Sequence, residues 1–280
     1  MRAVGRAYGS TIAFSRGVPS GGIYVMNTDG ARLTRITTHP GDDWSAWSPG
    51  AAEIAFDRSR RGKQDIYVMR ADGRRLRRLT SDGASGSPTW SPDRTRIAFA
   101  REASGNADIY VMDADGTRVA RLTRDPRLEY SPVWSPDGSR IAYAAYSKGP
   151  PPSPTRLYVM NANGSHTRTI GPDSAALPSW SPDGTEIAFV KEDDGSVYAI
   201  SPAGSGLRRV VAVASLPGGR HFPPNFTSRP AWSPDGRRIV FAAGKIGSSH
   251  LYGVDLDGSA LEELTHGAVE DRAPAWSSAH

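Results

Sequence analysis

The sequence predicts an all-β protein, a six-bladed β-propeller whose blades are four-stranded antiparallel sheets. A segment of the form Trp-Ser-Pro-Asp-Gly recurs along the chain, neighbouring copies begin 43 to 52 residues apart, and short strand-forming segments follow each copy. A repeat of this length that is built from several short strands is typical of a propeller blade. The tryptophans that mark the copies are Trp47, Trp90, Trp134, Trp180, Trp232 and, in shortened form, Trp276.

The copy at Trp134 indicates why each one forms a strand, a tight turn and a second strand. Pro136 fixes its own φ, Asp137 can bond to the backbone that follows it, and Gly138 accepts positive φ, as a turn requires. The segment 141–143 then alternates large and small residues, which is typical of a strand with one packed face. We expect the periodic tryptophans to form the core between blades.

Two further strands complete each repeat. A third strand is predicted at segments such as Asp108–Met112, and a turn such as Ala114–Gly116 leads to a fourth strand that ends near Leu122-Thr123. The first repeat, which begins at Thr11, lacks its Trp strand, whereas 273–277 is a Trp strand with nothing after it. We therefore expect residues 268–277 to complete the first blade, so that residues 1–280 form one closed ring without an open sheet edge.

Composition excludes several classes of function. The formal net charge is +5 and the pI is about 9.6, but the arginines are spread over the repeats. The densest group, Arg74, Arg75, Arg77 and Arg78, falls on a predicted outermost strand, where charge discourages edge-to-edge pairing, so we expect no nucleic-acid partner. The chain has no cysteine, and no apolar run approaches the ~20 residues of a transmembrane segment.

The two ends of the predicted ring differ. Antiparallel strands in series send alternate connections to opposite ends, so the Ser-Pro-Asp-Gly and Asp-Gly turns share one end, which we call the turn end. The other, irregular end receives connections of varied length, the longest being Val213–Pro230. Loops that vary on a rigid scaffold are where function usually resides.

Charged residues approach the irregular end of the central channel. The positions five residues before each tryptophan are Asp42, Ser85, Glu129, Ala175, Thr227 and Asp271. We predict a binding surface there that consists of Asp42, Asp43, Glu129, Tyr130, His221, Phe222, Arg229, Asp271 and Arg272. The alternative interpretation is a solvated polar rim held by mutual salt bridges.

Motifs for catalysis and for cofactors are missing from the sequence. There is no Gly-x-Ser-x-Gly elbow, no phosphate-binding loop and no His-Glu-x-x-His pair, and the six histidines are scattered. Asp113–Gly116 and Asp255–Gly258 begin like calcium loops but lack the glutamate at the twelfth position. We expect no catalytic residue, no metal and no cofactor.

The repeat resembles that of the TolB β-propeller family. The resemblance rests on Trp-Ser-Pro-Asp-Gly-x-x-Ile-Ala-Phe followed by Asp-Ile-Tyr-Val-Met-x-Ala-Asp-Gly, and it covers nearly the whole chain. It implies a six-bladed propeller used for protein binding in the bacterial cell envelope, in the periplasm or otherwise outside the cytoplasm. The segment 1–6 lacks the apolar core of a secretory signal, which leaves a cytoplasmic location open.

Together these observations predict a non-enzymatic, monomeric propeller scaffold that binds a protein or peptide at its irregular end. Two other functions remain open, because similar repeats also form the propellers of some enzymes. One is a lyase-like carbohydrate-active enzyme with acids at the channel mouth. The other is the accessory propeller of a prolyl-oligopeptidase-type peptidase that lacks its catalytic domain.

Overall fold

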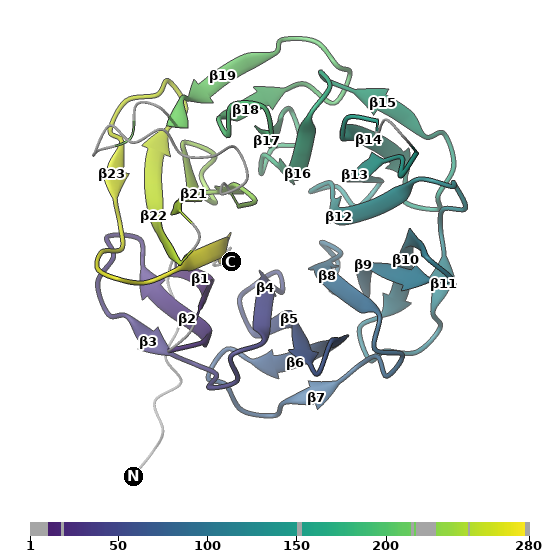
Figure 1. The fold of residues 1–280 in the computed structure, drawn as a ribbon, viewed down its shortest axis with the longest axis horizontal. Helices are drawn as coiled ribbons and strands as arrows, with labels where there is room; N and C mark the ends of the chain where they lie inside the picture. Colours follow the sequence, from purple (N-terminus) through teal and green to yellow (C-terminus); the bar gives the residue numbers. More distant parts are fainter. Residues whose placement is uncertain are drawn as a thin grey trace.

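The computed structural model describes residues 11–17, 20–149, 153–213, 216, 228–245 and 247–277, and it shows a ring of six four-stranded antiparallel sheets (Figure 1). Each sheet is one blade, with its first strand at the channel and its last strand at the rim. The predicted fold class is therefore confirmed. Among the described residues, no helix is long and apolar enough to cross a membrane.

The blades are numbered from the N-terminus, and their strands are given from the channel outward. Blade 1 contains β24 (Asp271–Trp276), β1 (Thr11–Arg16), β2 (Gly22–Asn27) and β3 (Thr34–Arg35). Blade 2 contains β4 (Asp42–Trp47), β5 (Glu53–Arg60), β6 (Lys63–Arg70) and β7 (Arg77–Arg78). Blade 3 contains β8 (Ser85–Trp90), β9 (Arg96–Ala103), β10 (Asn106–Asp113) and β11 (Ala120–Arg121). Blade 4 contains β12 (Leu128–Trp134), β13 (Arg140–Tyr146), β14 (Arg156–Asn161) and β15 (Arg168–Ile170). Blade 5 contains β16 (Ala175–Trp180), β17 (Ile187–Lys191), β18 (Val197–Ile200) and β19 (Arg208–Val211). Blade 6 contains β20 (Ala231–Trp232), β21 (Arg238–Lys245), β22 (Ser248–Asp255) and β23 (Glu262–Glu263).

The last described strand closes the ring, as the incomplete first repeat predicts. β24 pairs antiparallel with β1, with Ile12 opposite Trp276 and Arg16 opposite Asp271. The backbone amide of Ser277 donates a hydrogen bond to the Thr11 carbonyl, and the Ser277 hydroxyl accepts one from the Thr11 amide. Blade 1 therefore joins the two ends of the described chain and leaves no unpaired inner edge.

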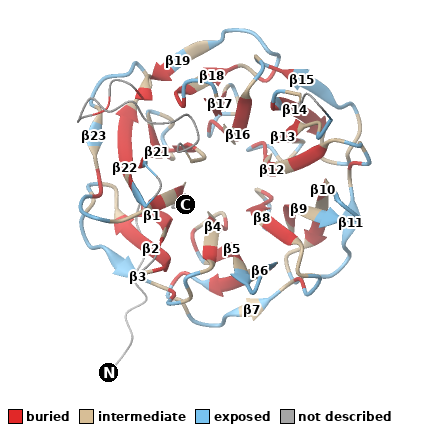
Figure 2. Cartoon of the chain, viewed as in Figure 1, coloured by how far each residue is buried: buried red, intermediate tan, exposed pale blue. Residues whose placement is uncertain are grey.

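The tryptophans form the core between blades. Trp134, for example, is buried in one cluster with Ala98 and Val111 of blade 3 and with Ile141 and Met160 of its own blade. In blade 1 the middle strands β1 and β2 are more buried than the channel strand β24, and rim strands such as β3, β7 and β11 are largely exposed (Figure 2). Since each blade covers its neighbour's apolar face, the ring as a whole supplies the core.

One expectation about the rim needs correction. Arg74 and Arg75 do not lie on the outermost strand, because β7 contains only Arg77 and Arg78. Arg75 has a φ of 54°, which belongs to the turn before the strand. Short rim strands themselves limit edge-to-edge pairing.

The turn end is uniform because its aspartates bond to the turns themselves. The Ser135 hydroxyl donates to Asp137 Oδ1 at 2.5 Å, and the Ser139 amide donates to the same oxygen at 3.0 Å. These bonds lower the pKa of Asp137 to about 2. Gly138 follows with a φ of 69°. The same serine-to-aspartate bond recurs at Asp93, Asp183 and Asp235.

A bulge that sequence reasoning missed interrupts the inner strands. Each register shift lies two to three residues before the tryptophan, and the residue three before it has positive φ in five blades. These residues are Trp44, Ser87, Ser131, Leu177 and Ala273. Arg229 occupies the corresponding position before Trp232. The bulge changes which side chains face the channel.

Candidate functional site

Two of the predicted site residues form ion pairs within their own blades. The carboxylate of Asp42 accepts hydrogen bonds from Nε and Nη2 of Arg58 at 2.5 and 2.9 Å. The carboxylate of Asp271 accepts hydrogen bonds from the same two nitrogens of Arg16 at 2.6 and 2.8 Å. Both carboxylates are buried, so they stabilise blades 1 and 2 and offer no free oxygen edge to a ligand.

The arginine partners were missed, although the sequence carries a signal for them. Arg58 and Arg16 each stand two residues after the phenylalanine of the second strand, directly opposite the aspartate in the sheet register. Each guanidinium also lies over the tyrosine of the third strand, 4.8 Å from the ring centre. An aspartate five residues before the tryptophan, together with an arginine two residues after the phenylalanine of the second strand, therefore indicates a structural ion pair.

Glu129 occupies the same position in blade 4 but has no such arginine. Its register partner is Ala145, and its carboxylate accepts a hydrogen bond from the Thr123 hydroxyl. Arg127 lies over the ring of Tyr158 and pairs with Asp125 instead. Burial raises the pKa of Glu129 to about 7, with the hydrogen bond from Thr123 opposing the shift.

The remaining predicted residues make different contacts. Arg272 reaches from blade 1 to blade 2, where its Nε is 2.9 Å from Asp43 Oδ2, and it also approaches Glu270 at 3.4 Å. Tyr130 packs edge-on against Tyr146, with its hydroxyl 3.4 Å from Thr155 Oγ1. His221 and Phe222 lie outside the described residues.

A cavity of about 510 Å³ opens at the irregular end beside blade 3, and two of the predicted residues, Glu129 and Tyr130, line it. The other lining residues are Gly62, Gln64, Gly83, Ala84, Gly86, Ser87, Ala100, Glu102, Ser104, Gly105 and Ala107. They belong to the hairpin tips of blades 2 and 3 and to the start of β8. The structure thus brings Glu129 and Tyr130 together and leaves Asp42 and Asp271 in separate ion pairs.

Asp57 is a buried acid that the sequence did not single out. Its Oδ2 accepts a bond from the Ser87 amide of the next blade at 2.9 Å, whereas its buried Oδ1 has no partner. Burial, with the neighbouring Asp43 carboxylate, raises the pKa of Asp57 to about 7. Gly86 lies close beside it, since a Cβ there would lie 2.8 Å from the Gln64 side chain and 3.0 Å from Asp57 Oδ2.

The raised pKa of Asp57 predicts a specific pH dependence of stability. The folded protein keeps a proton on Asp57 up to about pH 7, whereas the unfolded chain loses it near 3.8. Stability from this group is therefore present at low pH and is lost as pH rises from about 4 to about 7. We expect Asp57→Asn to reduce the decline in unfolding free energy across this range by on the order of 1–4 kcal/mol. Urea unfolding at several pH values measures it.

Asp137→Asn is the matched control for this measurement. The pKa of Asp137 is lowered to about 2, so its contribution is lost only as pH falls from about 4 to about 2. The control should leave the decline between pH 5 and 8 as in the parent chain. An Asp57→Asn profile parallel to that of the parent would mean that Asp57 is already ionised in the folded protein.

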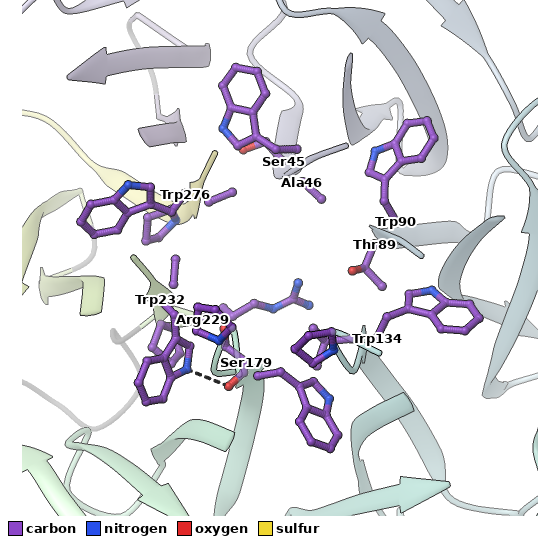
Figure 3. Close-up of a pocket in the computed structure, with 18 of the residues that line it drawn as sticks. Ser45, Ala46, Thr89, Trp90, Trp134, Ser179, Arg229, Trp232 and Trp276 are labelled. Carbon is purple, nitrogen blue, oxygen red and sulfur yellow. Dashed lines mark hydrogen bonds between the residues drawn. The ribbon is translucent and has the colours of Figure 1, made fainter. Parts of the chain in front are cut away.

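A second cavity, of about 460 Å³, occupies the channel toward the turn end. Its lining contains the six periodic tryptophans, the prolines of the Ser-Pro turns and the small residues Ser45, Ala46, Thr89 and Ser179. Arg229 extends from blade 6 toward the middle of this ring (Figure 3). Its guanidinium lies 5.5 Å from the centre of the Trp44 ring.

Solved structures with the same architecture identify the type of propeller. TolB from Acinetobacter baumannii is 22% identical with a TM-score of 0.82, and the match covers 97% of this chain and 67% of that one. A putative TolB from Agrobacterium tumefaciens is 17% identical with a TM-score of 0.69, covering 96% of this chain and 98% of that one. The fold is that of a TolB-like propeller.

The TolB-like fold also occurs outside TolB proteins. A chain of a nidogen/laminin complex is 15% identical with a TM-score of 0.73, and the match covers 97% of this chain and 99% of that one. No protein-family model matches the sequence, and a search of curated proteins finds no similar one. Within the part of the chain that the structure describes, no three histidine, aspartate or glutamate side chains are grouped so that they could hold a metal ion.

Proposed function

We propose that the chain is a non-enzymatic TolB-like scaffold that binds a protein or peptide at the irregular end of its ring. The observation that carries the proposal is Glu129, a buried carboxylate beside the 510 Å³ cavity whose register partner is Ala145 rather than an arginine. In blades 1 and 2 the equivalent carboxylate is neutralised by a guanidinium. A lysine or arginine of a partner supplies the missing cation in blade 4.

The surroundings of Glu129 suit a peptide. Gln64, Ser87 and Tyr130 line the cavity with groups that can donate or accept hydrogen bonds, and Glu102 adds a second, exposed carboxylate. Asp43 and Arg272, which pair across blades 1 and 2, belong to the proposed surface, whereas Arg229 lines the separate channel cavity. Asp42 and Asp271 support this surface through their ion pairs. The predicted surface also includes His221 and Phe222, which lie outside the described residues.

The cellular setting is part of the proposal. Similarity to TolB structures supports a place in the bacterial cell envelope, with the propeller in the periplasm. A propeller chain in the nidogen/laminin complex shows that this architecture occurs in protein assemblies. We expect the chain to act as a monomer there.

Selection from a displayed random-peptide library tests the proposal. We expect the intact chain to enrich peptides with a lysine or arginine at one position, because a cation is needed opposite Glu129. The best synthetic peptide should lose at least about 30-fold in affinity for Glu129→Gln, since removing one member of a buried charged pair costs about 2–5 kcal/mol. Calorimetric titration measures the change.

Glu102→Gln provides the matched control, because Glu102 lines the same cavity but is exposed. It should change affinity less than about threefold, as a screened surface charge does. Peptides without a basic residue, or equal binding by Glu129→Gln, would contradict the proposed recognition. Enrichment of no peptide at all would contradict the binding function.

A further inference from the structure

Arg229 has an unfilled hydrogen-bonding edge inside the channel. Within the part of the chain that the structure describes, its Nε and Nη2 are both buried and have no hydrogen-bond partner, although the side chain as a whole is only half-buried because it lines the cavity. No carboxylate among the described residues lies within ion-pair distance of it. Asp57 acts on it only electrostatically, without contact.

Two arginines of the same molecule show what fills such an edge. Arg16 and Arg58 each use Nε and Nη2 together, and each binds the two oxygens of one aspartate. This side-on geometry is the strong bidentate arrangement between guanidinium and carboxylate. At Arg229 the same two nitrogens are the ones without a partner.

The lining of the cavity around Arg229 further restricts the chemical class of the ligand. Arg229 is the single charged residue among the described lining residues, and most of the others are tryptophan, proline, alanine or valine. Ser45, Thr89 and Ser179 add small polar groups. One cation in an apolar cavity matches one negative charge on an apolar body, whereas a phosphate dianion needs more donors and more positive charge.

We propose that the channel cavity at the turn end receives a carboxylate attached to a small apolar group, bound side-on by Nε and Nη2 of Arg229. The carboxylate belongs either to a free organic acid or to the C-terminus of a peptide, and the cavity volume of about 460 Å³ accommodates a group of that size. This site lies away from Glu129, so its test is independent of the function proposed above.

Binding requires a small movement of the side chain. The buried edge is held beside Trp44, and the arginine side chain has several rotatable bonds through which the edge can turn toward the cavity. Burial lowers the pKa of Arg229 to about 10, opposed by Asp57, so the guanidinium stays charged at neutral pH. A buried charge without a partner destabilises the ligand-free protein.

The first arm of the test measures stability without ligand. Arg229→Met keeps much of the side-chain volume and removes the charge, so we expect it to raise the thermal unfolding midpoint of the full chain. Arg58→Met is the matched control, since its guanidinium is paired, and it should lower the midpoint. A lower midpoint for Arg229→Met would show that Arg229 has a stabilising partner and would overturn the proposal.

The second arm measures ligand binding by calorimetric titration. Benzoate and its neutral isostere benzamide are the probes, and we expect benzoate to bind at least tenfold more tightly. Arg229→Met should abolish that preference, and Arg229→Lys should retain part of it because the charge remains while the fork is lost. Equal binding of acid and amide, no binding of benzoate, or an unchanged preference in Arg229→Met would overturn the proposal.

A second pair of probes distinguishes the two sources of the carboxylate. A tripeptide ending in phenylalanine is titrated with a free and with an amidated C-terminus. Preference for the free terminus, lost in Arg229→Met, assigns the site to peptide termini. Binding of benzoate without binding of either tripeptide assigns it to free organic acids. Both results support a carboxylate site, and Glu129→Gln should change neither.

Discussion

Truncation after Gly267 should open the ring and lower the free energy of unfolding by several kcal/mol. The change removes β24, which leaves β1 without its inner neighbour and exposes the apolar faces on both sides of blade 1. It also leaves the guanidinium of Arg16 without Asp271. We expect the thermal midpoint to fall by about 10 °C or more, and calorimetry measures it.

Two controls separate ring closure from a loss of chain length. A chain that ends at Ser277 keeps β24 and the bonds of Ser277 to Thr11, so it should melt like the full chain. A synthetic peptide of residues 268–280 should restore part of the lost stability to the truncated chain. A truncated chain that melts at the parent temperature and remains monomeric would refute closure through β24.

Asp42→Ala should lower the free energy of unfolding by about 3–5 kcal/mol. The substitution leaves Arg58 buried without its counter-charge, and the cost of a broken buried pair arises mainly from the charge that remains. Hydrogen bonds to Asp42 raise the pKa of Arg58 above its usual value, against the opposing effect of burial. Urea unfolding measures the change.

A double substitution tests whether the remaining charge is the cause. Asp42→Leu combined with Arg58→Met replaces the pair with apolar side chains of similar size and should recover most of the stability. Asp173→Ala is the exposed control, because Asp173 and Arg156 are 57% and 49% exposed, and it should cost less than about 1 kcal/mol. Equal losses in the single and double variants of blade 2 would contradict this account.

The fold could be predicted because its signals are local and repeated. The turn at Trp134 combines proline, aspartate and glycine in adjacent positions, and the spacing of such turns counts the blades. The first repeat lacks a Trp strand, and the segment at Trp276 is a Trp strand without a repeat of its own, which indicates that the two ends meet. The pairing of β24 with β1 confirms this prediction. None of these signals requires knowledge of contacts between blades.

The state of the charged groups could not be predicted in the same way. Whether Asp42 is free depends on Arg58 opposite it, and that register depends on the bulge at Trp44. Asp57 is unusual because Ser87 and Gly86 of the next blade enclose it. Arg229 has no ion-pair partner among the described residues, because its position in the ring places none of their acids beside it. Each of these facts depends on residues that are distant in the sequence.

Hydrogen–deuterium exchange with a selected basic peptide bound tests most directly whether recognition takes place at the irregular end. We expect slower exchange in segments 62–64, 84–87, 102–107 and 128–130, which surround the cavity that contains Glu129. The Glu129→Gln variant at the same peptide concentration should lack this protection. Protection confined to the turn segments 135–139 and 181–185 would place binding at the opposite end of the ring and contradict the account.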